Sequence, residues 1–220
     1  MANNTNTNAD DAADAADAAD TGASAVDADA ADVADADASA MAMAAPAGSI
    51  PVTVMGNLGQ AFAGIRIGTQ QMIWPNNAPL NSTWFVVVDL TYLQVVANVV
   101  STSTTQVPPA LGPYIANPGF MLIAVSLGWT FDHVPQGALY SFLRSTGSGA
   151  ALERAEQIYA QLGTGYFSSL GYILAATLDS SDGSGIEEFG YMGPIPIMTF
   201  SLLPVTVGGK TTYTPIKTWR

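Results

Sequence analysis

Two dense apolar runs decide the fold: residues 84–90 read WFVVVDL, and residues 120–127 read FMLIAVSL. Both runs are rich in β-branched and aromatic side chains, and polar or glycine-containing segments bound them. Continuous apolar runs of this length are typical of strands that are buried on both faces. We therefore predict that the two runs form the centre of a β-sheet and that the rest of the domain is built around them.

Weaker patterns predict further strands. Residues 95–100 follow the first run after the short Thr91-Tyr92 connection, and this spacing predicts a hairpin. Residues 74–77 read WPNN and predict a turn. The other strand candidates are residues 50–55, which alternate like an edge strand, residues 62–67 and residues 172–178.

The end of the domain predicts a closing hairpin. Residues 195–207 and 211–216 flank Gly208-Gly209, a dipeptide that is typical of tight hairpin turns. Pro196, Pro204 and Pro215 indicate sheet edges, because proline cannot donate a hydrogen bond to a neighbouring strand.

Helical patterns are short. Residues 150–162 carry an apolar stripe of helical spacing, followed by Gly163 as the expected C-terminal cap. Residues 138–144 predict two further turns, and the prolines of residues 101–117 limit that segment to single turns. The predicted fold class is α+β, a compact β-rich sandwich with a few short helices. We expect one core to contain Val86, Val88, Leu122, Ile123, Val125, Ile158, Leu162 and Leu174.

Residues 1–48 differ from the rest of the chain. They hold ten of the eighteen acidic residues, all of them Asp, and no Lys or Arg. Alanine and aspartate alternate with almost nothing to bury, so we predict a disordered acidic tail and linker. Residues 49–220 are predicted to form a single globular domain. The tail is expected to keep this domain soluble, and the alternatives are a tail that docks on a basic partner and a tail without a role.

The charge of the chain argues against several partners. Only fourteen of the last 172 residues are charged, and the six basic residues are scattered among them. A nucleic-acid or anionic membrane partner is therefore not expected. The sequence shows neither a transmembrane segment nor a signal peptide. Display on a particle and export by another route stay open.

Residues that support catalysis are sparse. The chain has no cysteine and one histidine, His133, which is too few ligands for a metal site. The acids of residues 179–188 lack the spacing of a calcium loop. The triplets Gly147-Ser148-Gly149 and Gly183-Ser184-Gly185 lack the context of a phosphate loop. We predict a protein without enzymatic activity, cofactor or metal.

One segment carries the residues of a candidate binding site. Residues 128–149 follow a predicted central strand and combine aromatic with charged side chains, which are enriched at binding hot spots. The candidate residues are Trp129, Asp132, His133, Tyr140 and Arg144. The alternative is structural: Trp129 covers the core and Arg144 pairs with a nearby acid.

The order of the segments resembles a known family. AFAGIRIG (61–68), WFVVVDL, GFMLIAVSL (119–127), LERAEQIYAQLGTG (152–165) and SLGYILAATL (169–178) follow one another. This order is similar to the interleukin-like epithelial–mesenchymal transition inducer (ILEI) domain, which itself resembles pancreatic-derived factor and the stem domain of a protein O-mannose N-acetylglucosaminyltransferase. The resemblance implies a β-rich sandwich without catalysis that acts in signalling or glycan recognition. It also implies a glycan-contacting acid, here Asp132, and an arginine whose position falls near Ile173.

Three functions remain open from the sequence. The first is a non-enzymatic recognition module for a carbohydrate or a cell surface, with a glycan or protein surface as its partner. The second is a structural or assembly subunit of a virion or surface layer, which implies a homo-oligomer. The third is an enzyme whose residues do not match a known motif.

Overall fold

The computed structural model describes residues 48–56, 63–69, 71–162, 170–191 and 195–218. The chain divides into two units, Met1–Ala40 and Met41–Arg220, and the fold described below belongs to the second. The predicted disorder of residues 1–47 and the predicted cap at Gly163 lie outside the described residues.

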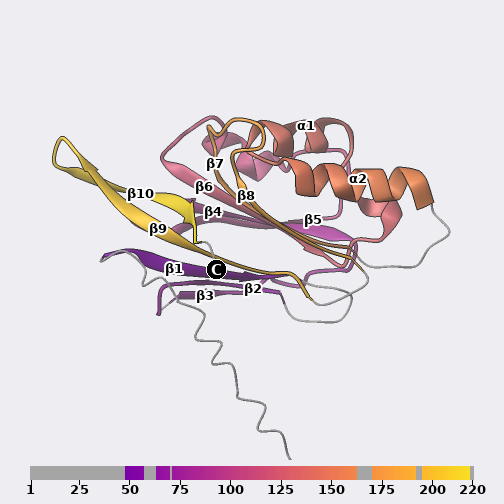
Figure 1. The fold of residues 1–220 in the computed structure, drawn as a ribbon, viewed down its shortest axis with the longest axis horizontal. Coiled ribbons are helices and arrows are strands. Elements are labelled where there is room, and N and C mark those ends of the chain that lie inside the picture. Colours follow the sequence, from indigo (N-terminus) through magenta and orange to yellow (C-terminus); the bar gives the residue numbers. More distant parts are fainter. Residues whose placement is uncertain (1–47, 57–62, 70, 163–169, 192–194, 219–220) are drawn as a thin grey trace, which may run out of the picture. The chain divides into compact units, whose positions relative to one another are not determined.

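The described strands form two antiparallel five-stranded sheets that pack as a β-sandwich (Figure 1). Sheet A has the order β10-β9-β1-β2-β3, and sheet B has the order β5-β4-β6-β7-β8. The strands are β1 (Ile50–Met55), β2 (Gly64–Ile67), β3 (Gln71–Ile73), β4 (Ser82–Asp89), β5 (Val95–Ser101), β6 (Phe120–Leu127), β7 (Leu170–Thr177), β8 (Ile186–Tyr191), β9 (Ile197–Val207) and β10 (Lys210–Lys217).

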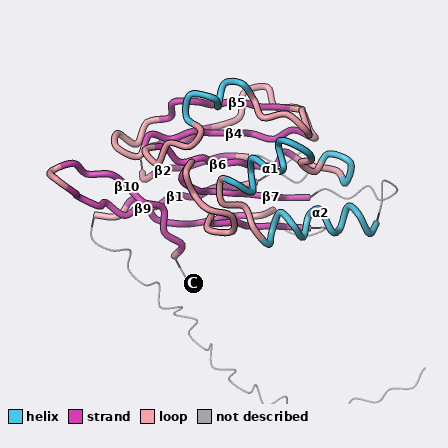
Figure 2. Tube along the Cα trace, turned by 90° about the horizontal axis from the view of Figure 1, so that it is seen from above, coloured by secondary structure: helices cyan, strands magenta, loops and turns pink. Residues whose placement is uncertain are grey.

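Short helices form a third layer on the side of sheet B that faces away from sheet A (Figures 1 and 2). They are the 3-10 helices η1 (Pro109–Tyr114) and η2 (Phe131–His133) and the α-helices α1 (Gly137–Ser145) and α2 (Ala150–Leu162). The predicted fold class, a β-rich sandwich with short helices, is therefore confirmed.

The two apolar runs form the centre of sheet B, as their composition predicts. Strand β4 lies between β5 and β6, and β6 lies between β4 and β7. All but one residue of each strand is buried. Both faces of these strands are apolar because sheet A packs on one face and the helices pack on the other.

The prediction of a single core is wrong, because two cores lie on opposite faces of sheet B. Val86, Val88, Ile123 and Val125 pack between the sheets, in the first core. The second core, under the helices, holds Leu122 and Leu174, with Ile158 at its margin; the side chain of Leu162 lies outside the described residues. Successive side chains of a strand point to opposite faces, so the neighbours Leu122 and Ile123 contribute to different cores.

Strand β1 is not the edge strand that its alternating pattern predicts. It lies inside sheet A, between β9 and β2. Val52 and Val54 pack into the first core, whereas Thr53 and Met55 are half-buried on the opposite side of the sheet. Apolar and more polar residues alternate in β1 because one side of the strand packs into the core and the other faces solvent. This pattern therefore does not predict whether a strand lies at the edge or in the middle of its sheet. Strand β8 was not expected from its sequence, which contains two glutamates and a glycine.

The prolines of the closing hairpin lie where a missing donor is tolerated. Val207 pairs with Lys210 across the Gly208-Gly209 turn, so alternation places Pro204 and Pro215 at positions that do not hydrogen-bond across the hairpin. The N–H of Tyr213, the partner of Pro204, donates instead to the carbonyl of Leu90 at 2.9 Å. Pro204 also lies beyond the last residue of β9 that pairs with β1, and Pro215 lies in the outermost strand. The edge prediction is correct for these two prolines.

Candidate functional site

The two outer faces of the sandwich differ. The outer face of sheet B, which we call the covered face, lies under η1, α1 and α2 and forms the second core. The outer face of sheet A, which we call the open face, is the side of its strands that points away from sheet B. No described helix packs on the open face (Figure 1). Within the described residues, the side chains of the open face are therefore not covered by a helical layer.

Trp74 is the main aromatic group on the open face. It follows β3, and the pairing of Ile73 with Ile65 places it opposite Gly64. A Cβ atom at Gly64 would lie 3.0 Å from the six-membered ring of the indole. The absence of a side chain at residue 64 thus lets the indole lie against strand β2. Trp74 remains 47% exposed in this position.

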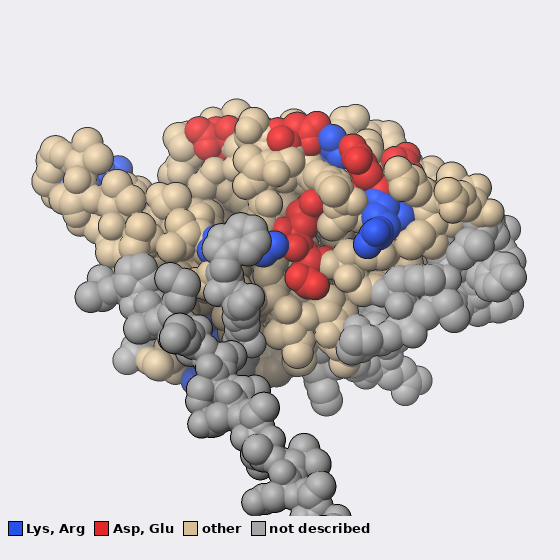
Figure 3. Space-filling view, in the orientation of Figure 1, with Lys and Arg blue, Asp and Glu red and all other residues tan. Residues whose placement is uncertain are grey.

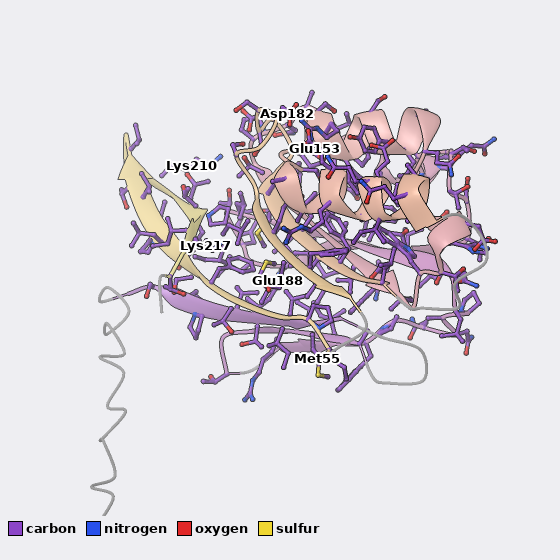
Figure 4. All side chains as sticks on the ribbon, turned by 45° about the vertical axis from the view of Figure 1, so that its right-hand side comes forward. Met55, Glu153, Asp182, Glu188, Lys210 and Lys217 are labelled. Atoms are coloured by element: carbon purple, nitrogen blue, oxygen red, sulfur yellow. The ribbon has the colours of Figure 1, made fainter. Side chains whose placement is uncertain are left out.

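Two rows of side chains continue the open face beside the indole. Met55 pairs with both Gly64 and Ile197, so these residues form one row across three strands. Thr53 pairs with both Arg66 and Thr199, and these three residues form the next row. Met55 points away from sheet B (Figure 4).

A shallow depression of about 280 Å³ lies on the open face, close to the small end of ligand sites. Its lining residues are Thr53, Met55, Gly64, Arg66, Trp74 and Ile197. The lining combines an exposed aromatic ring and apolar side chains with one hydroxyl and one guanidinium. Such a surface suits a ligand that has an apolar face and polar edges.

Trp129, the first residue of the sequence-predicted site, belongs to the interior. Its side chain is fully buried in the second core. Its indole stacks on the ring of Tyr172 at a centroid distance of 5.6 Å, and its Nε1 donates to the carbonyl of Ser82 at 3.0 Å. Trp129 is therefore placed to stabilise the sandwich, as the structural alternative expects.

Asp132 and His133 form a small polar cluster at η2. The hydroxyl of Thr130 donates to Asp132 at 2.6 Å, and Nδ1 of His133 lies 2.9 Å from the same carboxylate oxygen. The Thr130 hydrogen bond lowers the pKa of Asp132 below its ordinary value. Asn81 accepts from the backbone N–H of Thr130 at 2.9 Å. The cluster thus ties η2 to the segment that precedes β4.

Tyr140 and Arg144 lie one turn apart on α1. Arg144 forms ion pairs with Glu153 of α2 and, at 2.7 Å, with Asp182 of the loop between β7 and β8. These contacts, the one to Asp182 above all, raise the pKa of Arg144. Burial raises the pKa of Tyr140, and the charge of Glu156 adds to this effect. Arg144 therefore joins three segments of the helical layer, and its guanidinium already has two anionic partners.

The five predicted residues do not form one surface. Trp129 is buried, and in the described part of the chain no hydrogen bond or ion pair joins Asp132 or His133 to Tyr140 or Arg144. The local sequence does not reveal the open face, because residues 74–77 predict only a turn. Its proximity to Gly64 depends on the register of β2 and β3, which the sequence does not show.

The two Gly-Ser-Gly triplets, which lack the context of phosphate loops, pack against each other. The N–H of Gly185 donates to the carbonyl of Gly147 at 2.8 Å, and the N–H of Gly183 donates to the carbonyl of Ser148 at 2.9 Å. A Cβ atom at residue 185 would lie 2.8 Å from the carbonyl oxygen of Gly147. Only glycine allows this approach of two backbones.

A buried hydrogen-bond chain continues from this contact. The hydroxyls of Ser148 and Tyr172 lie 2.6 Å apart, and Tyr172 donates to Glu187 at 2.7 Å. Glu187 also accepts from the N–H of Ala151 at the start of α2. Burial, and then the charge of Glu187, raise the pKa of Tyr172 well above its ordinary value. Ser148 and Tyr172 are fully buried, so this chain holds α2 and β8 together rather than facing a substrate.

Three further observations concern the chain beyond the open face. Within the described part of the chain, no group of three or more His, Asp and Glu residues is placed to hold a metal ion. No described helix is long and apolar enough to cross a membrane. No family model and no curated protein matches the chain.

Proposed function

We propose that the domain is a non-enzymatic recognition module that binds carbohydrate through the open face of sheet A. The observation that carries this proposal is the exposed indole of Trp74, which lies on Gly64 beside a shallow depression. A pyranose ring has an apolar C–H face that stacks on an aromatic ring, and its hydroxyls require donors and acceptors at the edge. Thr53, Thr199 and Arg66 supply such groups on the neighbouring row.

The scaffold supports this function. The indole projects from a sheet whose opposite side packs into the first core, so the platform is held in place before a ligand arrives. A preorganised surface loses little conformational entropy on binding. The resemblance to the ILEI domain stays a prediction. The sandwich alone does not decide between functions, because one fold can host many of them.

Substitution of Trp74 tests the proposal. The full chain is titrated with an oligosaccharide panel, such as cello-, xylo-, manno- and galacto-tetraoses and their acidic counterparts, and binding is followed by calorimetry. We expect Trp74→Ala to weaken any binding found by about fivefold or more, because stacking on one aromatic ring contributes about 1 kcal/mol or more. Tyr92→Ala is the matched control, since Tyr92 is 73% exposed in the turn between β4 and β5. Absence of binding across the panel, or equal binding by both variants, contradicts the proposal.

A second candidate function is a structural or assembly subunit. The open face continues onto the β9–β10 hairpin, where Val207 is 74% exposed, and Ile197 on the same side of β9 is 57% exposed. Pro204 and Pro215 remove donors from the outer edges of that hairpin, which disfavours association by edge pairing. A second copy would therefore associate through the face rather than through an edge.

Sedimentation velocity distinguishes this candidate from the first. If the chain assembles through the open face, Val207→Asp shifts the oligomer toward the monomer. Leu80→Asp, at a residue that is 51% exposed outside sheet A, leaves the oligomer unchanged. A monomeric wild-type chain at all accessible concentrations contradicts the assembly function.

A further inference from the structure

The two layers of the sandwich carry charges of opposite sign. The described strands of sheet A contain Arg66, Lys210 and Lys217 and no acidic residue. Sheet B with its helices and loops, residues 82–191, contains only two arginines, Arg144 and Arg154, and all of the acids outside the tail. These acids are Asp89, Asp132, Glu153, Glu156, Asp179, Asp182, Glu187 and Glu188.

The figures show this division. Acidic side chains gather over the helical layer and sheet B in Figure 3. In Figure 4, Asp182 and Glu153 lie on the helical side of the molecule, and Lys210 lies on the β9–β10 hairpin. An anion at the depression meets Arg66 in its lining, whereas the acids nearest to sheet A, Glu187 and Glu188, line a separate hollow at the β8–β9 edge, with Lys217 among its residues. Because a Coulomb interaction weakens with distance and is screened by salt, the nearest charges decide its sign.

The nearest charge to the aromatic platform is the guanidinium of Arg66. Arg66 is exposed and lines the same depression as Trp74. Its hydrogen bond goes to the carbonyl oxygen of Thr69 at 3.4 Å, which is at the long limit for such a bond. Among the described residues it forms no ion pair with an acid, in contrast to Arg144, which has two. The open face thus offers a charged, planar donor with no anionic partner in the described part of the chain.

We infer that the open face binds an acidic sugar, whose ring stacks on Trp74 and whose carboxylate or sulfate is held by Arg66. This inference rests on the proposed carbohydrate function and adds the class of sugar. Guanidinium groups bind such anions through paired, charge-assisted hydrogen bonds, which are stronger than bonds between neutral groups. A neutral sugar makes the same stacking contact but leaves the positive charge of Arg66 uncompensated.

A short acidic glycan fits the charges of the open face better than a polyphosphate does. Three basic residues are spread over five strands, whereas nucleic-acid binding surfaces cluster many more along one face. The ten aspartates of residues 1–48 precede β1 in the same chain and repel a long polyanion. One anionic group beside one aromatic ring matches one acidic monosaccharide unit.

The experiment compares two acidic oligosaccharides with an uncharged ester. The full chain is titrated with tetragalacturonate, with its methyl ester and with a sulfated galactotetraose, in a calorimeter at low and at physiological salt. We expect each acidic ligand to bind about tenfold or more tightly than the ester, with a preference that salt weakens. Comparing the carboxylate with the sulfate identifies which anion the site prefers.

Two matched variants locate the effect. Arg66→Gln is expected to remove the preference for the acidic ligands, so that acid and ester bind with similar affinity. Arg154→Gln removes the same charge from exposed α2 in the acidic layer and is expected to keep the preference. Circular dichroism confirms that both variants are folded. Trp74→Ala is expected to lower the affinity for acidic and for neutral ligands by the same factor.

Several results would overturn the inference. If the acid and the ester bind with equal affinity and Trp74→Ala weakens the binding of both, the preference for acidic sugars is rejected. The carbohydrate function itself is then still supported. A preference that survives Arg66→Gln places the anion elsewhere. Binding of a single-stranded oligonucleotide of equal charge with equal affinity indicates an unspecific polyanion surface. Absence of binding to any sugar rejects the proposed function itself.

Discussion

The covered face of sheet B and the open face of sheet A belong to the same sandwich but differ in burial and polarity. The covered face is mainly apolar and is covered by helices, and several of its polar groups are joined in the buried chain from Ser148 to Glu187. The open face alternates apolar residues with threonines and carries an exposed indole. Stability is therefore concentrated in sheet B, and sheet A has one side that is available for a ligand or a partner.

Two tryptophans provide the strongest test of this difference. Trp129→Ala should cost about 3–5 kcal/mol of unfolding free energy, because the indole is fully buried and hydrogen-bonded. Trp74→Ala should cost about half as much or less, because about half of its surface already faces water. Denaturant unfolding of both variants measures the two costs. Similar costs would mean that the open face is as much a part of the packed interior as the covered face.

The contact between the glycine triplets predicts the next largest effect. Gly185→Ala places a Cβ atom 2.8 Å from the carbonyl oxygen of Gly147, and a backbone atom cannot move aside cheaply. We expect a loss of about 1–3 kcal/mol. Gly112→Ala in η1 is the control, since its added methyl meets no atom within 4 Å, and a change within about 0.5 kcal/mol is expected there. A neutral Gly185→Ala variant would show that the two loops do not hold this contact in solution.

Ionisation of Tyr172 is expected to make the unfolding free energy depend on pH. Its pKa is raised in the folded state, so the unfolded chain loses the phenol proton first as the pH rises through about 10. The stability contributed by the neutral phenol is complete below that pH and is lost above it. Tyr172→Phe should cost about 1–3 kcal/mol at neutral pH, because Ser148 loses its buried partner. It should also flatten the fall in stability above about pH 10, which thermal unfolding at several pH values measures. An unchanged alkaline profile would mean that Tyr172 titrates as an exposed phenol.

The acidic tail predicts the smallest effect. Removal of residues 1–45 should change the thermal midpoint by less than about 4 °C, roughly 1 kcal/mol for a domain of this size, and lower the solubility. The physical reason is the lack of apolar side chains to bury in the alanine–aspartate segment. A larger fall in the midpoint, measured by scanning calorimetry, would show that the tail covers part of the sandwich, and the open face would then be the first surface to examine.

Some elements of the fold could be predicted well. The runs at 84–90 and 120–127 became central strands because only a doubly covered strand can bury every one of their side chains. Helices α1 and α2 and the closing hairpin also followed from local spacing and turn residues. Strand β8 was missed because Glu187 has a structural role: its carboxylate accepts bonds from Tyr172 and Ala151, which are distant in sequence.

The sequence predicted which types of residue form the candidate site, but not where in the fold they lie. The sequence indicated aromatic and charged recognition residues and placed them after the second apolar run. Trp129 has the right chemistry, but it lies in the interior, because its nearest neighbours come from β4 and β7. Trp74 lies on the surface because the strand register places glycine beneath it.

Composition and periodicity by themselves determined the β-rich class, the central strands and the separation of an acidic segment from a charge-poor domain. These properties depend on which side chains must leave water, and that information is local in the sequence. Only the tertiary structure decided which face stays open, which tryptophan is buried and which sheet carries the positive charge. These properties depend on strand order and register, which bring together residues such as Gly64 and Trp74, or Gly147 and Gly185, that no local pattern connects.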